Sequence, residues 1–370
     1  MKILFVLENY YPNIGGVETL FKNLTEALAK KNIEVTVVTT QFDKKLLREE
    51  TINDVKIIRL PFYNRYIFTF LAFIPLISYA RKHDIIHTTS YNAGVPAFLA
   101  GLLSRTQTII TFHEVWGKLW FKLPYMNKLS LLLHYTFEKF LLALPFSHYI
   151  AVSNSTKIAL IEAGIPKSKI KKIYNGIDYS KFRSISEEEV NVKPNELYTF
   201  TYFGRLGISK GLDILLNGIR LLSKTEHSFK INLVIPKTPI DFHKRILQEI
   251  DEYKIAPIIT VHSHLPVDEL HSVIRESDTV IIPSYSEGFC FSAVEAMAIG
   301  TPIIHSGKGS LKEVVSAKHI MMQDLSADAL KDAMMRAIND DWDEIPQRKF
   351  ELKESVDLYL DFYKNLMKIS

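Results

Sequence analysis

The stretch YTFTYFGRLGISKGLDILL, residues 198–216, contains the pattern from which the fold can be worked out. Its first six residues are threonine and aromatic residues, a composition typical of a β-strand. Gly204 then marks a turn, and a helix is expected from about Gly211 onward. A strand that runs through a glycine-containing loop into a helix is the first part of a βαβ unit. The stretch therefore predicts an α/β domain.

The same alternation recurs along the whole chain and predicts parallel sheets with helices on both faces. We expect an N-terminal Rossmann-like domain over residues 1–182, an acidic, proline-containing linker over 183–197, and a second Rossmann-like domain over 198–345. A C-terminal helix over 346–370 is expected to pack back on the first domain. Two such domains leave a central cleft, and ligands bind at the carboxyl ends of the strands. The predicted strands are KILFVL (2–7), EVTVVT (34–39), DIIHTT (84–89), TIITFH (108–113), HYIAVS (148–153), YTFTYFG (198–204), KINLVI (230–235), PIITVH (257–262) and DTVIIPS (278–284).

Composition excludes several classes of protein. The chain has 370 residues, 47% of them hydrophobic, and a formal net charge of +4, which lacks the polybasic character of a nucleic-acid binder. Its single cysteine, Cys290, excludes an intrachain disulfide and a cysteine-based zinc site, so a cytoplasmic protein is expected. The longest uncharged run, between Arg65 and Arg81, is shorter than the roughly 18 residues that span a bilayer. The first apolar run ends at Glu8, too early for a signal peptide.

Two cations follow the strand in the opening stretch. Arg205 lies at the carboxyl end of that strand, and Lys210 lies close to the N-terminus of the next helix, where backbone N–H groups already favour an anion. Together they could hold a diphosphate without a metal. Two ordinary surface cations on a loop are the alternative interpretation.

A second pair of charges lies in SEGFCFSAVEAMAIGTPII, residues 286–304. Glu287 falls in a loop after a strand, and Glu295 falls on the following helix, which Gly300 ends. Glu295 can accept hydrogen bonds from a vicinal diol such as a ribose, and Glu287 can meet the adjacent sugar. The N–H groups around Phe289–Phe291 would face a phosphate. Taken singly, each glutamate is more often a solvated helix or loop residue.

The N-terminal half also contains candidate site residues, two glycines and two histidines that lie at or after the ends of its predicted strands. Gly15 and Gly16 follow the first strand and allow close approach of the backbone to a ligand, although a tight strand-to-helix turn also explains them. His113 ends a predicted strand and could hydrogen-bond a sugar hydroxyl or a phosphate, although lone histidines are often structural. His87 has the same kind of location with weaker support. The absence of a G-x-G-x-x-G motif after the first strand counts against a dinucleotide oxidoreductase.

In chain order, the motifs GGVE, TFHE, VSNSTK, YNGID, YFGRLGISKGLDILL and PSYSEGFCFSAVEAMAIGTPII resemble the retaining GT-B glycosyltransferases of family 4. The resemblance extends over nearly the whole chain, and the two glutamates with seven residues between them are its most specific part. It implies two Rossmann-like domains, a nucleotide-sugar donor bound mainly by the second domain, and an acceptor bound mainly by the first. It also implies retention of the anomeric configuration by same-face attack, without a protein nucleophile.

The resemblance also implies residue roles. Arg205 and Lys210 would bind the donor diphosphate, Glu295 the ribose hydroxyls and Glu287 the transferred sugar, while Gly16 would approach the phosphates and His113 the sugar. Two cations and helix N-termini can neutralise the leaving group without a metal. The expected catalytic residues are Glu287, Arg205, Lys210 and His113. The expected donor-binding residues are Gly15, Gly16, Arg205, Lys210, Glu287, Gly288, Phe289, Cys290, Phe291 and Glu295.

The sequence departs from the family pattern at three places, all in the second half. Pro236 and Lys237 replace a glycine-rich turn, and His264 stands where a glycine is common, so the choice between uridine and guanosine stays open. Cys290 replaces the more usual glycine in the Glu-Gly-Phe loop and constrains its backbone. We expect Cys290 to be structural, because no base is paired with it in the sequence.

Two apolar, cationic stretches of the first half, residues 63–83 and 116–146, have a composition suited to the interface of an anionic membrane. The second of them contains Trp116 and Trp120 among lysines. Core helices with a solvated lysine face are the alternative interpretation. A membrane contact would favour a lipid-linked acceptor and a location at the inner face of the cytoplasmic membrane.

The sequence therefore favours a metal-independent glycosyltransferase that moves a sugar from a UDP- or GDP-sugar to a glycan, lipid-linked or small-molecule acceptor, with no nucleic-acid partner. A nucleotide-sugar epimerase of the same fold is the nearest alternative. A glycoside hydrolase that uses Glu287 and Glu295 as its acid and base is a further one, but it leaves Arg205 and Lys210 without a role. A non-catalytic protein that binds nucleotide-sugars is the last.

Overall fold

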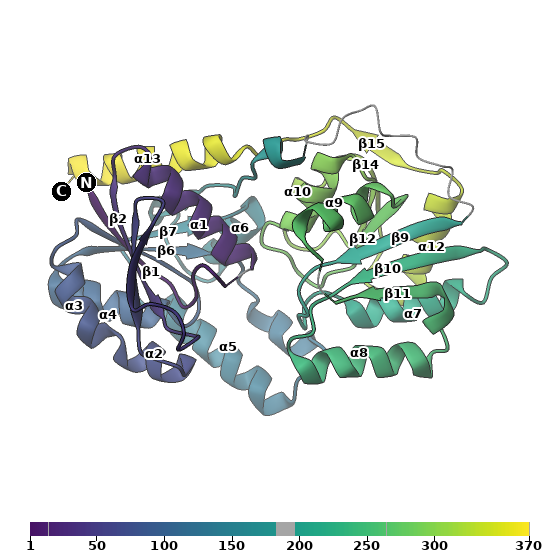
Figure 1. Cartoon of the computed structure of the whole chain (residues 1–370), viewed down its shortest axis with the longest axis horizontal. Coiled ribbons are helices and arrows are strands. Elements are labelled where there is room, and N and C mark those ends of the chain that lie inside the picture. The colour runs from purple at the N-terminus through teal and green to yellow at the C-terminus, as the bar shows by residue number, and fades with distance from the viewer. Residues whose placement is uncertain (14, 183–196, 264, 370) are drawn as a thin grey trace. The chain divides into compact units, whose positions relative to one another are not determined.

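The computed structural model divides into two compact units, each built around its own sheet (Figure 1). It describes residues 1–13, 15–182, 197–263 and 265–369. Unit 1 consists of Met1–Trp120, Lys128–Gly176 and Phe350–Ser370, and unit 2 consists of Phe121–Asn127 and Ile177–Lys349. The linker expected over 183–197 lies, apart from Leu197, outside the described residues, as does His264.

The sheet of unit 1 has eight strands in the order β3-β4-β2-β1-β5-β6-β7-β8. All neighbours are parallel except β3, which pairs antiparallel with β4. The chain starts in the middle at β1 and winds outward in both directions, as in a doubly wound fold. The strands are β1 (Lys2–Val6), β2 (Glu34–Thr40), β3 (Glu49–Ile52), β4 (Val55–Leu60), β5 (Ile85–Thr89), β6 (Gln107–Phe112), β7 (His148–Ala151) and β8 (Ile170–Lys172).

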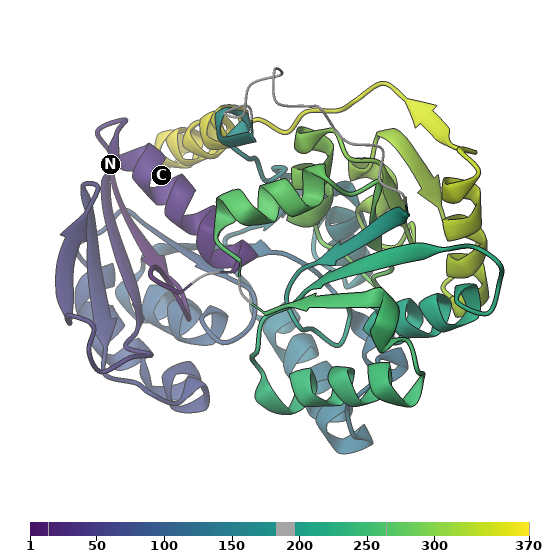
Figure 2. The ribbon, with the colours of Figure 1, turned by 45° about the vertical axis from the view of Figure 1, so that its right-hand side comes forward.

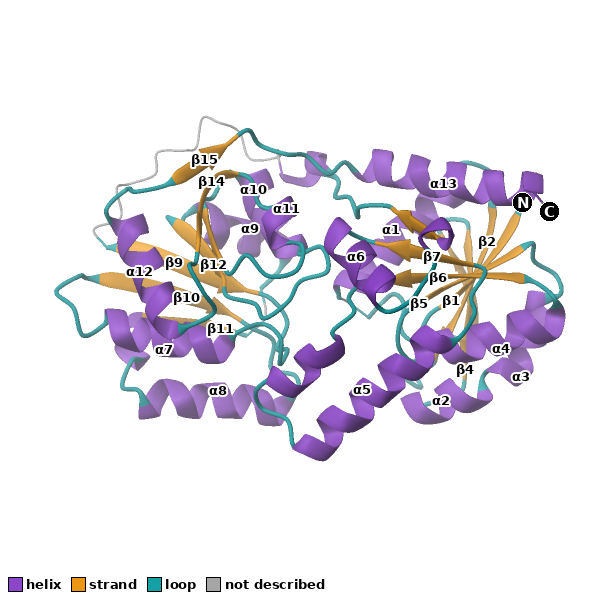
Figure 3. Ribbon diagram, turned by 180° about the vertical axis from the view of Figure 1, so that it is seen from behind, coloured by secondary structure: helices purple, strands orange, loops and turns teal. Residues whose placement is uncertain are grey.

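Helices cover both faces of this sheet (Figure 3). Helix α1 is amphipathic, and Leu20, Phe21, Leu24 and Leu28 form its buried face. Helix α2 begins where the side chain of Asn64 accepts hydrogen bonds from the next backbone N–H groups. The helices of unit 1 are α1 (Gly16–Ala29), α2 (Arg65–Leu71), α3 (Phe73–Ala80), α4 (Gly94–Ser104), α5 (Lys128–Ala143), α6 (Asn154–Glu162) and α13 (Leu352–Ile369), with the 3₁₀ helices η1 (Gly117–Lys122, which continues into unit 2) and η2 (Lys167–Lys169).

The sheet of unit 2 has seven strands in the order β11-β10-β9-β12-β13-β14-β15. Its neighbours are parallel except for β15, which pairs antiparallel with β14. The chain again starts near the centre, at β9, and winds outward to both edges. The strands are β9 (Tyr198–Phe203), β10 (Phe229–Val234), β11 (Ile259–His262), β12 (Thr279–Ile282), β13 (Ile303–His305), β14 (Ala317–Met321) and β15 (Asp343–Ile345). The prediction of two doubly wound α/β domains is confirmed.

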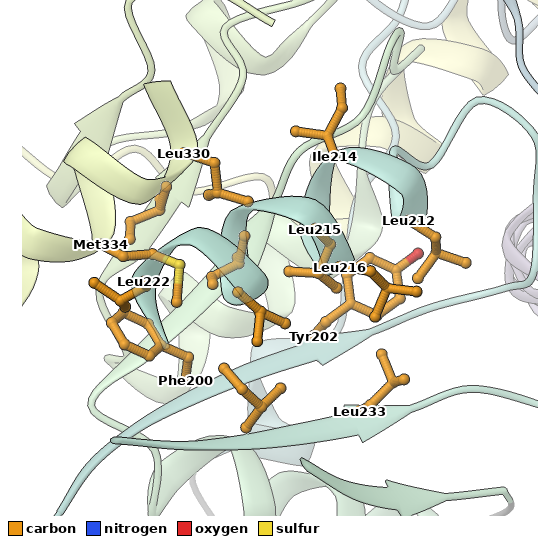
Figure 4. Close-up of a cluster of buried hydrophobic side chains, with 14 of the residues drawn as sticks. Phe200, Tyr202, Leu212, Ile214, Leu215, Leu216, Leu222, Leu233, Leu330 and Met334 are labelled. Carbon is orange, nitrogen blue, oxygen red and sulfur yellow. The ribbon is translucent and has the colours of Figure 1, made fainter. Parts of the chain in front are cut away.

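The core of unit 2 is built around α7, the helix of the opening stretch (Figure 4). Apolar side chains of α7 pack on Phe200 and Leu233 of the sheet, and Leu330 and Met334 of α12 cover them from the other side. The helices of unit 2 are α7 (Leu212–Leu222), α8 (Ile240–Glu252), α9 (Val267–Arg275), α10 (Phe291–Ile299), α11 (Leu311–Val314) and α12 (Ala327–Ile338), with the 3₁₀ helices η3 (Tyr179–Phe182) and η5 (Ala256–Ile258).

The last helix, α13, lies against α1 of unit 1 (Figure 2). Lys31, just beyond α1, forms an ion pair with Asp357 at 2.9 Å. Tyr359 and Tyr363 of α13 are fully buried, and the Tyr363 hydroxyl lies 2.5 Å from Nδ1 of His87 on β5. The C-terminal segment is thus an integral layer of unit 1.

No helix in the described part of the chain combines the length and the apolar character that crossing a bilayer requires.

Candidate active site in unit 2

Glu287 lies in the loop between β12 and α10, just beyond the carboxyl end of a central strand. The residue is 6% exposed, and its carboxylate accepts three hydrogen bonds. Lys210 Nζ donates to Oε1 and Oε2 at 2.8 and 2.9 Å, and Ser284 Oγ donates to Oε1 at 2.7 Å. Burial of a carboxylate is costly unless it is paired and hydrogen-bonded. These contacts therefore hold Glu287 in one orientation.

Lys210 reaches Glu287 because their strands are neighbours. It lies in the loop between β9 and α7, and β9 pairs with β12 in parallel. The carboxyl ends of parallel neighbours meet at one edge of a sheet, so the loops that follow them lie side by side. The sequence predicted that each residue follows a strand, but the two were assigned to different parts of the donor. The structure brings them into one ion pair.

The two loops are also interlocked through their backbones. The N–H of Tyr285 donates to the carbonyl of Ser209 at 2.7 Å. Gly211, the N-cap of α7, has a φ of +70°, a conformation that favours glycine. A Cβ at Gly211 would also collide with the Pro283 carbonyl oxygen. The glycine is required for the Lys210 loop to approach the Glu287 loop.

A third loop, which follows β13, holds the Glu287 loop in place through hydrogen bonds. The Ser310 N–H donates to the Glu287 carbonyl oxygen at 2.8 Å, and Ser306 Oγ donates to the Ser284 carbonyl oxygen at 2.6 Å. Gly309 has a φ of +59°, and a Cβ there would collide with the Glu287 backbone. The sequence marks this loop by the two glycines of GKGS, residues 307–310, and by Ser310 and Glu313, whose spacing fits a capping box.

Arg205 follows β9 after Gly204, and it is exposed and forms no ion pair with any described residue. Its charge acts on the hydroxyl of Tyr202, which lies inside the unit. Burial raises the pKa of Tyr202 far above its ordinary value, the Glu287 carboxylate adds to this rise, and Arg205 opposes it. The charges of Arg205 and Glu287 and the thiol of Cys290 all affect the pKa of this buried hydroxyl. These predicted residues therefore lie in one region of unit 2.

Cys290 is the N-cap of α10 and has a φ of +66°, in the left-handed region that favours glycine. The expectation that a non-glycine residue constrains this loop agrees with that geometry. Burial raises the pKa of the Cys290 thiol well above its ordinary value, Glu287 and Glu295 contribute to the rise, and Lys210 opposes it. The thiol is therefore protonated at neutral pH, which makes it a poor nucleophile.

Glu295 lies in the second turn of α10, half-buried, and forms no ion pair with any described residue. Burial raises its pKa to about 7, from an ordinary value of 4.5. Unlike Glu287, it is paired with no cation among the residues that the structure describes. Gly288 and Phe289 are buried in the loop ahead of α10, and the ring of Phe289 packs edge-on against Phe291 at 5.3 Å. The first N–H groups of a helix lack intrahelical partners, so this loop presents donors at the start of α10.

The predicted residues of unit 1 lie at the carboxyl edge of its own sheet. Gly15 is the N-cap of α1, Gly16 is the first residue of that helix, and His113 directly follows β6. His113 is half-buried and packs edge-on against Phe21 of α1 at 6.2 Å. It therefore lies close to the helix that Gly15 and Gly16 begin.

The weaker prediction for His87 is wrong. His87 is inside β5 and fully buried, with its ring between the hydroxyls of Tyr363 at 2.5 Å and Thr111 at 2.7 Å. Burial lowers its pKa to about 3. Its side chain joins α13 to the sheet and is not available to a ligand.

Two family sequence models match the chain in tandem. Glycosyltransferase Family 4 matches residues 14–181, and Glycosyl transferases group 1 matches residues 184–352. Together with the two doubly wound units, these matches decide the family. The chain is a GT-B glycosyltransferase. The four residues Arg205, Lys210, Glu287 and Glu295 of this glycosyltransferase all fall within the group 1 match.

Relatives of this glycosyltransferase extend over most of its length. A glycosyltransferase of Methanocaldococcus jannaschii is 27% identical over 338 residues, which are 85% of this chain and 83% of that protein. One of the subunits of human phosphatidylinositol N-acetylglucosaminyltransferase is 25% identical over 350 residues, which are 91% and 68% of the two chains.

Solved structures share the fold of this glycosyltransferase. Sucrose-phosphate synthase from Thermosynechococcus elongatus superposes with a TM-score of 0.78 at 20% identity, covering 100% of this chain and 99% of its own. The Anabaena protein HepE in complex with UDP-glucose gives 0.70 at 18% identity, covering 99% and 100%.

Among the residues that the structure describes, no group of three or more His, Cys, Asp and Glu side chains is arranged to hold a metal ion. The expectation of a metal-free site stays a prediction that a chelation experiment must test.

Proposed function

We propose that this glycosyltransferase transfers a sugar from a UDP- or GDP-sugar to a glycan, lipid-linked or small-molecule acceptor, with retention of configuration and without a metal. The observation that carries the proposal is the partly buried Glu287–Lys210 ion pair, with Arg205 exposed in the same loop as Lys210. A carboxylate held by one cation, with a second cation in the same loop, suits a donor with sugar hydroxyls at one end and a diphosphate at the other.

Charge development in the reaction explains the two cations. As the glycosidic bond breaks, negative charge grows on the nucleoside diphosphate, and preorganised cations that meet this charge lower the barrier. Lys210 is already oriented by Glu287, because two of its contacts go to that carboxylate. An ammonium group can bridge a carboxylate and a phosphate oxygen, since it has three donors. Arg205 would approach the same diphosphate from the solvent side.

Glu287 suits the role of a positioning group better than that of an acid or a nucleophile. Its carboxylate accepts hydrogen bonds from Lys210 and Ser284, which fix its orientation and direct its lone pairs. A glycoside hydrolase that uses Glu287 as its general acid would need this carboxyl to donate a proton to the leaving group, but in this site both of its oxygens accept hydrogen bonds. The ion pair therefore supports a transferase in which Glu287 accepts hydrogen bonds from hydroxyls of the donor sugar.

The first test combines donor binding and turnover. In a thermal-shift screen with UDP, GDP, ADP and their sugar conjugates, a ligand at about 100 times its dissociation constant adds roughly 2.7 kcal/mol to the stability of the folded state. Arg205→Ala and Lys210→Ala should each lower turnover about 100- to 1,000-fold, because each removes a charge partner of the transition state. The exposed Lys230→Ala, on β10, is the matched control and should leave turnover unchanged.

The outcomes separate the candidate functions. Near-wild-type turnover in both cation variants would sink the assignment of the diphosphate site. Turnover of the nucleotide-sugar with no acceptor present would indicate an epimerase. Donor binding without turnover of any acceptor would indicate a non-catalytic binding protein. Activity should survive EDTA, and complete loss that Mn²⁺ restores would contradict a metal-free reaction.

The acceptor is proposed to be lipid-linked, and the protein to work at the inner face of the cytoplasmic membrane. The name of the human relative includes phosphatidylinositol, and a Salmonella relative is a lipopolysaccharide N-acetylglucosaminetransferase, 25% identical over 197 residues. These names support an acceptor with a lipid part. Transfer to detergent-solubilised glycolipids, compared with free oligosaccharides, tests this point.

A further inference from the structure

Helices α2 and α3 of unit 1 present an apolar stripe to solvent. Ile67, Phe70, Leu71 and Ile74 keep between 48% and 60% of their surface exposed. Their spacing of three, four and seven positions places them on one side of a helical segment. The opposite side is buried, with Phe68 and Leu76 in the core. The segment is thus apolar on both sides, and only one of them is covered by the unit.

Helix α5 has the same property. Leu129, Leu132, Leu133 and Phe140 keep between 48% and 66% of their surface exposed and also follow helical spacing. The covered side of α5 packs into the core through residues such as Leu141. An amphipathic surface helix normally turns polar residues to water, so the exposed stripe on α5 is unusual for a fully solvated face.

Helix α4 lies between these two stripes and joins them into one layer. It packs against α2 and α3 on one side; on the other, Gly94 lies so close to Leu141 of α5 that a Cβ would collide with it, and Phe98 packs against Phe146, just beyond α5. Figures 1 and 3 show α2, α4 and α5 on the same face of the unit 1 sheet. Leu102 and Leu103, at the end of α4, are also more than half exposed. We call the exposed side of α2 to α5 the apolar face.

Cations border this face, and acidic side chains are nearly absent from it. Between residues 55 and 146 the acids are Asp84, Glu114 and Glu138. Glu138, the only acid on the four helices, is buried, where it accepts hydrogen bonds from the backbone N–H groups of Trp116 and Gly117 at 2.8 and 2.7 Å. The exposed cations on and beside the helices are Arg81, Lys82, Arg105, Lys128 and Lys139, together with Arg65, which forms an ion pair with Glu8 at 3.0 Å.

We propose that the apolar face is a docking surface for an anionic phospholipid bilayer, on which the glycosyltransferase lies as a peripheral protein. The apolar stripes of α2–α3 and α5 enter the boundary between headgroups and acyl chains, and the surrounding cations contact anionic headgroups. The charge pattern selects this partner, because each lysine or arginine near the surface adds to the affinity for an anionic bilayer. The tryptophans that the sequence suggested for this contact are not part of it, because Trp120 is buried and the tilted ring of Trp116 packs against it at 4.4 Å.

Binding to a bilayer can be measured without a sugar donor. A failure of this proposal can therefore be distinguished from a failure of the proposed reaction. The experiment is flotation of the full chain with vesicles of phosphatidylcholine alone and of phosphatidylcholine mixed with phosphatidylglycerol, at low and high salt. The wild type should bind the anionic vesicles at least about tenfold more tightly, and high salt should weaken that binding.

Two triple variants test the two stripes separately. Ile67→Ser/Phe70→Ser/Ile74→Ser and Leu129→Ser/Leu132→Ser/Leu133→Ser should each lower binding to anionic vesicles at least about tenfold, since the side chains are exposed in the free protein and buried in the bound one. The matched control, Ile240→Ser/Val267→Ser, removes two equally exposed apolar residues of unit 2 and should bind like the wild type.

Three outcomes would overturn the proposal: no binding of the wild type to either vesicle, full binding by both triple variants, or equal loss in the control. A concentration-dependent dimer in light scattering that both triple variants abolish would assign the face to a second copy of the chain instead. Circular dichroism and the donor-induced thermal shift confirm that each variant is folded.

Discussion

At the scale of single residues, the two glutamates of the loop and helix have opposite electrostatic environments. Glu287 is buried with a lysine and a serine, whereas Glu295 is half-buried without a cation, and its pKa is raised to about 7. Near neutral pH the Glu295 carboxyl is therefore divided between its protonated and ionised forms. A ligand that hydrogen-bonds to Glu295 would shift this balance.

Through Glu295 we expect donor affinity to depend on pH. If its carboxylate accepts the ribose hydroxyls, affinity should rise up to about tenfold from pH 6 to pH 8 as the ionised fraction grows. Glu295→Gln should remove this dependence, whereas Glu269→Gln, which alters an exposed glutamate of α9, should keep it. Calorimetric titration with the nucleotide-sugar measures both. An equal pH dependence in Glu295→Gln would exclude Glu295 from the donor site.

The same group also affects stability. Its pKa in the folded protein lies above its ordinary value of 4.5, so the folded state binds more protons between pH 4.5 and about 7. Relative to Glu295→Gln, the wild type should thus lose stability as the pH rises through this window. The expected loss is on the order of 1–2 kcal/mol, measured by denaturant unfolding at several pH values, once partial exposure is taken into account.

The sequence allowed the site residues to be located but not their interactions. Arg205, Lys210, Glu287 and Glu295 could be placed at strand ends and on a helix because glycines and β-branched runs mark those boundaries. The Lys210–Glu287 contact could not be predicted, since it depends on β9 and β12 being neighbours although three helices and two strands separate them in the chain. The buried position of His87 was missed for a similar reason, because its partner Tyr363 lies in the last helix.

At the scale of secondary-structure elements, α13 is joined to β5 by a buried polar contact. The neutral ring of His87 lies between Thr111 and Tyr363, and none of the three side chains is exposed to water. Loss of one partner in such a place leaves a polar atom without a hydrogen bond, which costs more than the bond itself contributes.

Tyr363→Phe should therefore lower the free energy of unfolding of unit 1 by about 1–3 kcal/mol, because it removes the hydroxyl that faces Nδ1 of His87. Tyr66→Phe, which removes an exposed hydroxyl of the same unit, should change stability by less than about 0.5 kcal/mol. Chemical denaturation followed by circular dichroism compares the two. Equal effects of both substitutions would contradict the structural role of the contact.

The elements that could be predicted are those with strong local patterns. All nine predicted strands correspond to observed ones, because each is a β-branched or aromatic run of six or seven residues. The strands that were not predicted are β3, β4, β8, β13, β14 and β15. Most of these are short or lie towards the edges of their sheets, where pairing with a neighbour decides the conformation more than local preference does. VKIIRL at β4 was a usable signal that was overlooked.

At the scale of the whole molecule, the chain enters unit 2 for the segment Phe121–Asn127, returns, enters it again at Ile177, and ends in unit 1. The short segment is fixed in unit 2 by Tyr125, whose ring packs under the guanidinium of Arg245 at 4.4 Å and against Phe242 at 4.8 Å. Unit 1 is thus assembled from three pieces of the chain.

Deletion of residues 350–370 should destabilise unit 1 selectively. It uncovers the surface on which Val356, Tyr359 and Tyr363 are buried, at a cost of several kcal/mol. Calorimetry should show the unfolding transition of unit 1 at a lower temperature. The transition whose temperature rises when nucleotide-sugar binds should stay where it is. Leu358→Ser, on the exposed side of α13, is the control and should leave both unchanged. A parallel shift of both transitions would contradict assignment of α13 to unit 1 alone.

The position of α13 also affects the order in which the two units can fold during synthesis. During translation, residues 1–176 leave the ribosome long before Tyr359 and Tyr363, so one side of β5 and α1 stays uncovered until α13 has emerged. All pieces of unit 2 are by then available. An N-terminal domain usually folds first as it emerges. Here the order is reversed, because unit 1 contains the first residues to be synthesised but completes its core after unit 2.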